Sequence, residues 1–93
     1  MAKKILIVDD SESIRDVVNF TLETQGYEVI VGVDGQDAVQ HLNGQHIDLI
    51  ITDLYMPNMN GISLIKEIRK NENYKRTPVL LLTTESQQEK KME

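Results

Sequence analysis

The sequence contains no cysteine, which excludes a disulfide framework and any metal site built on thiolates. No apolar run approaches the roughly 20 residues that a transmembrane helix requires. The N-terminus passes from Lys3 and Lys4 directly into a short apolar run, without the longer apolar stretch and small-residue cleavage site of a signal peptide. We therefore expect a cytoplasmic protein.

Clustered positive charge is also lacking. The formal net charge is −5, whereas a nucleic-acid partner calls for cations gathered opposite its phosphates. The densest basic stretch lies within residues 69–76, where Asn71, Glu72 and Asn73 dilute it; its cations are Arg69, Lys70, Lys75 and Arg76. We interpret this stretch as a solvated helix end and loop, and predict no direct contact with nucleic acid.

What is present describes one small domain. The chain has 93 residues, of which 40% are apolar and 27% charged. This composition supports a core and argues against intrinsic disorder. There is no low-complexity segment, linker or internal repeat, so we treat residues 1–93 as a single unit.

Short apolar runs alternate with helical patterns along the chain. We expect strands over residues 5–8, 28–33, 47–52 and 79–82, helices over 12–25, 36–42 and 62–70, and the start of another helix over 86–93. Ser11 or Asp10 could cap the first helix, Gly26 would end it, and Phe20 lies off its apolar stripe. Strands that are nearly continuous apolar runs, each followed by a helix, predict an α/β fold with a parallel sheet and helices on both faces.

Polar residues follow three of the four expected strands. Asp9 and Asp10 follow the first strand, Asp53 the third, and Thr83 and Thr84 the fourth. A parallel sheet brings its carboxyl ends to one edge, where ligands bind, so we expect these residues to share a pocket. A lone aspartate at a strand end is usually a cap or turn residue, but this set is hard to obtain by chance.

Three crowded carboxylates repel one another, and a hard divalent cation would relieve the repulsion. Magnesium takes oxygen ligands and is bound through one or two carboxylates plus phosphate oxygens. No histidine or cysteine accompanies the aspartates, which disfavours zinc and copper. The sequence therefore predicts a magnesium site.

Three segments carry a family resemblance: residues 5–10 (ILIVDD), 53–61 (DLYMPNMNG) and 78–83 (PVLLLT). They resemble the receiver domains of two-component response regulators, and the similarity runs from the first strand to the chain end without a visible gap. The pattern Asp-x-x-Met-Pro-x-Met-x-Gly is highly specific. The resemblance implies a flavodoxin-like, doubly wound parallel sheet.

The resemblance also implies a role for each matching position. Asp53 would be the phosphoacceptor, attacking a phosphorus carried by a kinase histidine and becoming an acyl phosphate. Asp10 and Asp53 would ligate Mg2+ directly, Asp9 would reach it through water, and Tyr55 would add its backbone carbonyl. Thr83 would hydrogen-bond the phosphoryl oxygens and act as a switch.

The family further implies a signalling phosphoacceptor that catalyses its own phosphorylation, not a conventional enzyme. Its partners would be a histidine kinase or phosphotransfer protein and a downstream protein. Tyr55 and Glu85 match positions that tune dephosphorylation, although plain surface roles fit them equally well. We interpret the remaining candidates as ordinary surface residues (His41, His46) and as loop and packing residues (Met56, Met59).

Receivers have five strands and five helices, whereas this chain ends inside the expected fourth helix. We therefore expect a truncated receiver domain with four strands and about three and a half helices. It would lack the lysine and the aromatic switch residue of strand 5, since Lys90 and Lys91 belong to the interrupted helix. The strand over 79–82 would then lie at the sheet edge and favour homo-oligomers, by pairing across a two-fold axis or by exchange of elements.

Three other functions remain open at this point. A fragment could act only as a self-associating interaction or folding module, without phosphotransfer. A metal-dependent phosphohydrolase with Asp53 as nucleophile is disfavoured, because its Asp-x-Asp motif would need aspartate at position 55, which is Tyr55. A flavin-binding protein is disfavoured because no Ser/Thr-Gly-rich phosphate loop follows the first strand.

Overall fold

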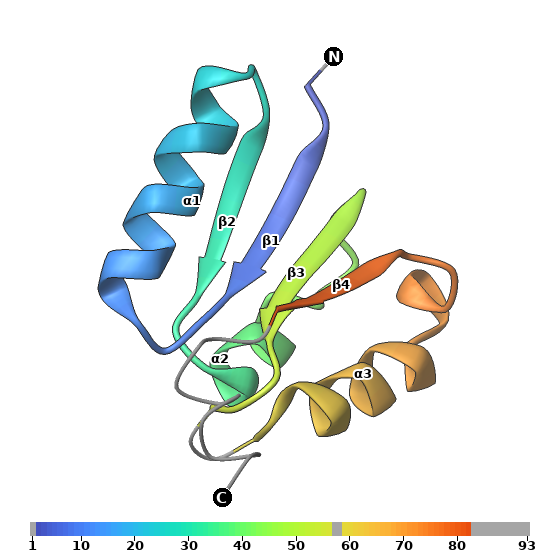
Figure 1. The fold of residues 1–93 in the computed structure, drawn as a ribbon. Helices are drawn as coiled ribbons and strands as arrows, with labels where there is room; N and C mark the ends of the chain where they lie inside the picture. The colour runs from blue at the N-terminus through green and yellow to red at the C-terminus, as the bar shows by residue number, and fades with distance from the viewer. Residues whose placement is uncertain (1, 57–58, 83–93) are drawn as a thin grey trace, which may run out of the picture.

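The computed structural model describes residues 2–56 and 59–82 (Figure 1). The elements are β1 (Lys4–Val8), α1 (Glu12–Thr24), β2 (Glu28–Gly32), α2 (Gly35–Gln40), β3 (Leu49–Asp53), α3 (Gly61–Lys70), the 3-10 helix η1 (Glu72–Tyr74) and β4 (Val79–Leu82). The four strands form one sheet in the order β2-β1-β3-β4, and every pairing is parallel. The predicted α/β fold is confirmed.

The sheet separates two apolar layers because successive side chains of a strand point to opposite faces. Leu6, Val8 and Ile50 face the layer that contains Leu64 and Ile68 of α3, all of them fully buried. The other face carries three buried isoleucines, on which Val18 and Leu22 of α1 pack; they are Ile5, Ile7 and Ile51. The helices thus lie on both faces, as the continuous apolar strands predicted.

Side-chain caps start the three α-helices. The Ser11 hydroxyl accepts a hydrogen bond from the Ile14 N–H at 3.3 Å, so Ser11 and not Asp10 caps α1. Asp34 caps α2 and Asn60 caps α3 in the same way. Gly26 follows α1 with a positive φ of 90°, the conformation expected of a terminating glycine. Phe20 is 73% exposed, as its position off the stripe predicted.

The third strand begins later than predicted. Ile47 is buried, but pairing with β1 starts at Leu49, opposite Ile5. Asp48 joins the two segments instead: its N–H donates to the Lys4 carbonyl and its carboxylate accepts the Lys4 N–H, both at 2.8 Å. An apolar run marks burial but cannot show where the ladder starts. The helix expected over residues 86–93 lies outside the described residues.

The basic stretch of residues 69–76 spans the end of α3 and the loop that follows it, and its interpretation as merely solvated is wrong for Arg69. One Arg69 nitrogen donates to the carbonyls of Tyr74, Lys75 and Thr77 at 3.0, 3.1 and 2.7 Å. Tyr74 is only 1% exposed, and its hydroxyl donates to the Gln45 carbonyl at 2.7 Å. These contacts fix the loop that leads into β4.

The described helices are too short or too polar to cross a membrane. α1, which has 13 residues, is the longest of them.

Candidate metal centre

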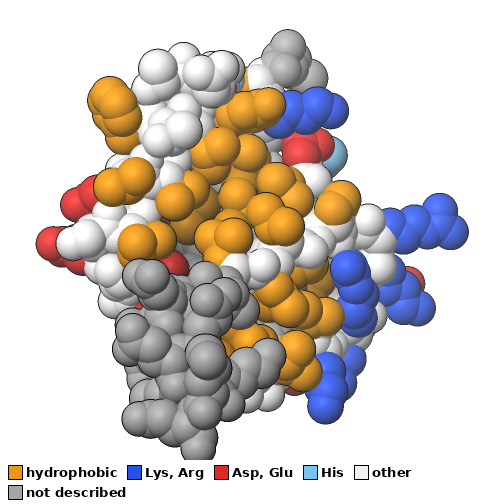
Figure 2. Space-filling model, in the orientation of Figure 1, with side chains coloured by type: hydrophobic (Ala, Val, Ile, Leu, Met, Phe, Trp, Pro, Cys, Tyr) orange, Lys and Arg blue, Asp and Glu red, His pale blue; other side chains and the backbone are white. Residues whose placement is uncertain are grey.

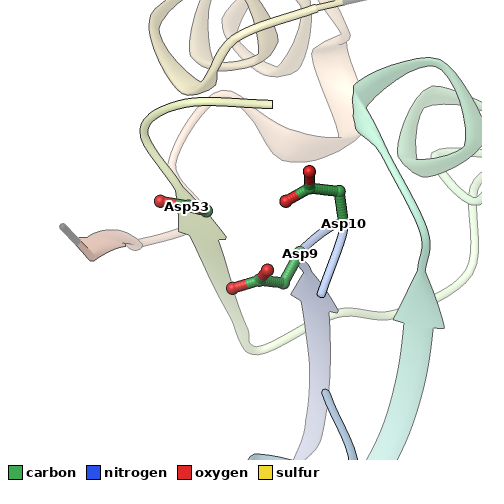
Figure 3. A group of neighbouring side chains, drawn as sticks. All are labelled: Asp9, Asp10 and Asp53. Atoms are coloured by element: carbon green, nitrogen blue, oxygen red, sulfur yellow. The ribbon is translucent and has the colours of Figure 1, made fainter. Parts of the chain in front are cut away.

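Three carboxylates meet where β1 and β3 end (Figure 3). β1 and β3 are neighbours in the sheet, with Val8 opposite Thr52, so Asp9, which follows β1, lies beside Asp53, the last residue of β3. Asp9, Asp10 and Asp53 each offer one carboxylate oxygen, and these oxygens lie within 4.8 Å of one another. Asp9 and Asp53 are buried, whereas Asp10 is exposed. The clustering expected from the parallel sheet is present.

Hydrogen bonds from β2 and from the start of α1 hold Asp9 in place. Its N–H donates to the Gly32 carbonyl of β2 at 3.2 Å. One of its carboxylate oxygens accepts the Ser11 N–H at 2.8 Å, and its carbonyl accepts a hydrogen bond from the Arg15 guanidinium at 2.7 Å. No sequence pattern indicated this role for Arg15, because the hydrogen bond to the Asp9 carbonyl depends on the direction in which α1 leaves the loop. The loop between β1 and α1 is therefore fixed before any ligand arrives.

The chain folds back tightly after Asp53. The Leu54 N–H donates to the Leu82 carbonyl of β4 at 3.1 Å, and the Gly61 N–H donates to the Leu54 carbonyl at 2.7 Å. A Cβ atom built on Gly61 would lie 2.6 Å from the Asp53 carbonyl oxygen, closer than such atoms pack. Gly61 therefore allows the start of α3 to lie directly against the end of β3.

The electrostatics of the cluster favour a cation. Burial raises the pKa of Asp9, and the negative charges of Asp53 and Asp10 raise it further. The Ser11 N–H and the Arg15 guanidinium oppose this shift without reversing it. A hard divalent ion would offset the repulsion and the loss of hydration together, so the residues present fit magnesium.

The other predicted site residues divide into described and undescribed positions. Tyr55 lies two residues after Asp53 and is 49% exposed. Thr83, Thr84, Glu85 and Pro57 lie outside the described residues. Neither histidine belongs to the cluster: His41 pairs with Asp37 at 3.8 Å, and His46 with Asp48 at 2.6 Å. Met56 and Met59 pack against the core layer under α2 and α3, as predicted.

The raised pKa of Asp9 leads to a prediction for Asp9→Asn. Because the folded state favours the neutral form of Asp9, the contribution of this group to stability is full below its ordinary pKa of 3.8 and is lost as the pH rises through the raised pKa. Without divalent ions, Asp9→Asn should therefore be more stable than the wild type at pH 7, with the difference shrinking toward pH 4. Urea unfolding in the presence of a chelator measures this.

The same variant should bind Mg2+ about 10- to 100-fold more weakly, as happens when an outer-sphere partner is removed. Calorimetric titration with Mg2+ checks this second effect. Asp16→Asn is the matched control, because Asp16 is an exposed carboxylate of α1 outside the cluster. A metal-free Asp9→Asn protein less stable than the wild type at pH 7 would contradict the proposed repulsion.

Comparison with known proteins gives a consistent result. A family model described as the response regulator receiver domain matches residues 5–93. A curated relative, the CAI-1 autoinducer sensor kinase/phosphatase CqsS of Vibrio cholerae, is 42% identical over 79 residues, which cover 84% of this chain. The chain spans only 12% of that relative's length.

Two solved structures have the same fold over 99% of this chain. The chemotaxis protein CheY4 of Vibrio cholerae is 44% identical with a TM-score of 0.87, and the chain covers 77% of it. The receiver domain of the sensor histidine kinase PA1611 of Pseudomonas aeruginosa is 33% identical with a TM-score of 0.86, and 75% of it is covered. That structure has a magnesium ion coordinated in its active site cleft.

Proposed function

The chain belongs to the response regulator receiver domain family, and on that premise we propose that Asp53 is the residue that accepts the phosphoryl group. Receiver domains are phosphoacceptors of two-component signalling rather than conventional enzymes. The observation that carries the assignment is the cluster itself. Asp53 is buried at the carboxyl edge of the sheet, and its carboxylate lies within 4.8 Å of those of Asp9 and Asp10.

In the proposed transfer, a carboxylate oxygen of Asp53 attacks the phosphorus of a phosphohistidine on the donor. The new bond joins that oxygen to phosphorus, and the bond between phosphorus and the imidazole nitrogen breaks, so that the imidazole leaves with the electron pair. The backbone contacts of Leu54 and Gly61 hold the acceptor strand in place. Positioning and electrostatics account for most of what phosphoryl transfer requires.

The neighbouring residues would hold the metal. Asp10 and Asp53 would ligate Mg2+ directly, Asp9 would act through water, and Tyr55 would contribute its backbone carbonyl. When bound, the ion supplies charge neutralisation on the transferring group. The magnesium ion in the PA1611 receiver domain, which is 33% identical to this chain, supports this part of the proposal. Thr83, which lies outside the described residues, would hydrogen-bond the phosphoryl oxygens.

The proposed donor is a histidine kinase or a phosphotransfer protein, and the proposed receiver of the signal is a downstream protein. The similarity to a sensor kinase/phosphatase supports the first partner. A cytoplasmic location and self-catalysed phosphorylation belong to the same proposal. The alternative of a module without phosphotransfer is not favoured, because the family match includes the acceptor strand and the carboxylate cluster is assembled.

Intact mass spectrometry tests the proposal. The 93-residue chain is incubated with a small-molecule phosphodonor such as acetyl phosphate, once with Mg2+ and once with a chelator. We expect a gain of one phosphoryl group with Mg2+ and none with the chelator. No gain under conditions in which calorimetry shows Mg2+ binding would contradict the assignment, and so would a gain that is independent of the metal.

A further inference from the structure

The chain contains two Asn-Gly pairs, Asn43–Gly44 and Asn60–Gly61. Asparagine is one of the thermolabile residue types. In an Asn-Gly pair the backbone nitrogen of the glycine can attack the side-chain carbonyl carbon (Cγ) of the asparagine, because a glycine has no Cβ to obstruct the approach. By sequence the two pairs are equivalent, but the structure places their glycine nitrogens in different surroundings.

The Asn60–Gly61 pair is held firmly at the start of α3. The Asn60 Oδ1 atom accepts the Ser63 N–H at 2.8 Å, and the Gly61 N–H donates to the Leu54 carbonyl at 2.7 Å. Gly61 is buried, and a Cβ built on it would lie 2.6 Å from the Asp53 carbonyl oxygen. Attack by the Gly61 nitrogen would break the hydrogen bond to Leu54 where the backbone has no space to rearrange.

The Asn43–Gly44 pair lies in the loop between α2 and β3, and both of its residues are exposed. The Asn43 Oδ1 atom accepts the Gln45 N–H at 3.3 Å, an arrangement that turns the side chain towards the peptide that follows it. The Gly44 N–H donates to the Tyr74 hydroxyl at 3.0 Å, a longer contact than the one that holds the Gly61 N–H. The Gly44 nitrogen is therefore the less firmly held of the two.

The charges near Gly44 favour the reaction. The attacking nitrogen must give up its proton, and a nearby cation stabilises the negative charge that results. Gly44 lines a hollow of about 690 Å³ together with Lys75, Arg76 and Glu72. Glu72 pairs with Lys75 at 3.3 Å, so Arg76 supplies the excess positive charge. Figure 2 shows Lys and Arg side chains gathered on the side of the molecule where Figure 1 places α3 and the loop after it.

The charges near Gly61 oppose the reaction. Gly61 packs against the Asp53 carbonyl, and the Asp53 carboxylate lies within 4.8 Å of those of Asp9 and Asp10. Three carboxylates disfavour a further negative charge beside them. Hydrogen bonding, burial and charge therefore all favour reaction at Asn43 over reaction at Asn60.

We propose that Asn43 is a site of spontaneous modification, at which the Gly44 nitrogen closes a succinimide ring that water then opens, while Asn60 is protected. The bond from the Gly44 nitrogen to Cγ of Asn43 forms, and the bond from Cγ to the amide nitrogen breaks. Ammonia leaves with the proton that the Gly44 nitrogen gives up. One water molecule adds to either ring carbonyl and gives aspartate or isoaspartate. The inference is independent of the proposed phosphotransfer.

Isoaspartate would strain this loop, because it lengthens the main chain by one methylene group. The loop is held on both sides of Asn43: the Leu42 carbonyl accepts the Asn71 side-chain N–H at 3.2 Å, and the Gln45 carbonyl accepts the Tyr74 hydroxyl at 2.7 Å. A longer main chain cannot keep both contacts at these distances. Asn43→Asp retains the oxygen that accepts the Gln45 N–H, so it reproduces the other product without lengthening the chain.

Peptide mapping of the folded chain tests the site. The wild-type chain is incubated with a chelator in mildly alkaline buffer, and mass spectrometry follows the replacement of the side-chain NH2 by OH. We expect conversion at least about 10-fold faster at Asn43 than at Asn60, the factor that one hydrogen bond of ordinary strength can supply. In urea the two rates should be similar, because the folded contacts are lost. Conversion at Asn43 no faster than at Asn60 in the folded chain would overturn the proposal.

Tyr74→Phe tests the part played by the hydroxyl. It removes the acceptor of the Gly44 N–H and should speed conversion at Asn43 by up to about 10-fold without changing the rate at Asn60. Tyr27→Phe is the matched control, because Tyr27 is a partly exposed tyrosine that precedes β2. An unchanged rate at Asn43 would contradict this role of Tyr74. An equal increase at Asn60 would contradict it too, because general unfolding would then explain the effect.

Urea unfolding of the separated products tests the strain in the loop. The isoaspartate form should unfold at a lower urea concentration than the unmodified chain, whereas Asn43→Asp should unfold close to the wild-type midpoint. Equal midpoints for the isoaspartate form and Asn43→Asp would show that the loop accepts the longer main chain, and would overturn this consequence of the modification.

Discussion

Asp53→Asn is expected to abolish phosphoryl transfer while preserving the fold. The amide has the shape of the carboxylate but no negative charge, so it is a far weaker nucleophile toward phosphorus. Asp53 is only 4% exposed and lies at the end of a central strand, where an isosteric side chain causes little repacking. The mass gain seen for the wild type with phosphodonor and Mg2+ should fall below detection.

Asp16→Asn is the control for this experiment, since it removes an exposed carboxylate of α1 outside the cluster. It should accept the phosphoryl group at the wild-type rate. A persistent mass gain in Asp53→Asn would contradict the assignment. Asp9 and Asp10 would then be the first acceptors to examine, because their carboxylates lie within 4.8 Å of that of Asp53, and peptide mapping would locate the group.

Gly61→Ala is expected to lower the free energy of unfolding by about 1–3 kcal/mol, the usual cost of inserting a methyl group into a well-packed region. The new Cβ would lie 2.6 Å from the Asp53 carbonyl oxygen, 2.9 Å from a Leu81 methyl and 3.1 Å from the Leu54 Cα. Two of these atoms belong to the backbone and cannot rotate away. The destabilisation therefore comes from a lack of space beside the end of β3.

Urea unfolding measures the effect, with Ser63→Ala as the control because Ser63 is exposed in the same first turn of α3. Only Gly61→Ala should shift the midpoint strongly. Since the displaced atoms adjoin Asp53, Gly61→Ala should also slow phosphorylation. Unchanged stability together with a wild-type phosphorylation rate would show that α3 shifts away from β3 without a cost in free energy, and that Gly61 does not position Asp53.

Much of the site could be predicted from the sequence because its geometry follows from a simple rule. Once three apolar runs are recognised as parallel strands, their carboxyl ends must meet at one edge. This places Asp9 and Asp10 beside Asp53 with no knowledge of side-chain contacts. A cap at Ser11 or Asp10 and the stop at Gly26 were likewise predictable, since helix ends depend on a few adjacent residues; the structure selects Ser11.

Other features depend on tertiary contacts or on the path of a loop, which no local sequence pattern records. The start of β3 at Leu49 is set by its pairing with Ile5 of β1. Arg69 holds the loop before β4 only because the carbonyls of residues 74, 75 and 77 all accept hydrogen bonds from it. Arg15 reaches the Asp9 carbonyl only because α1 leaves its loop in that direction.

The sequence by itself therefore determined the element types, the parallel sheet and the three clustered aspartates, because periodicity and strand polarity are properties of local chain segments. Only the tertiary structure decided which carbonyls Arg15 and Arg69 bind and how closely Gly61 approaches the end of β3. α1 and α3 both have amphipathic sequences, yet α3 buries three residues and α1 none. That difference depends on which strands lie beneath each helix, and only the assembled sheet specifies it.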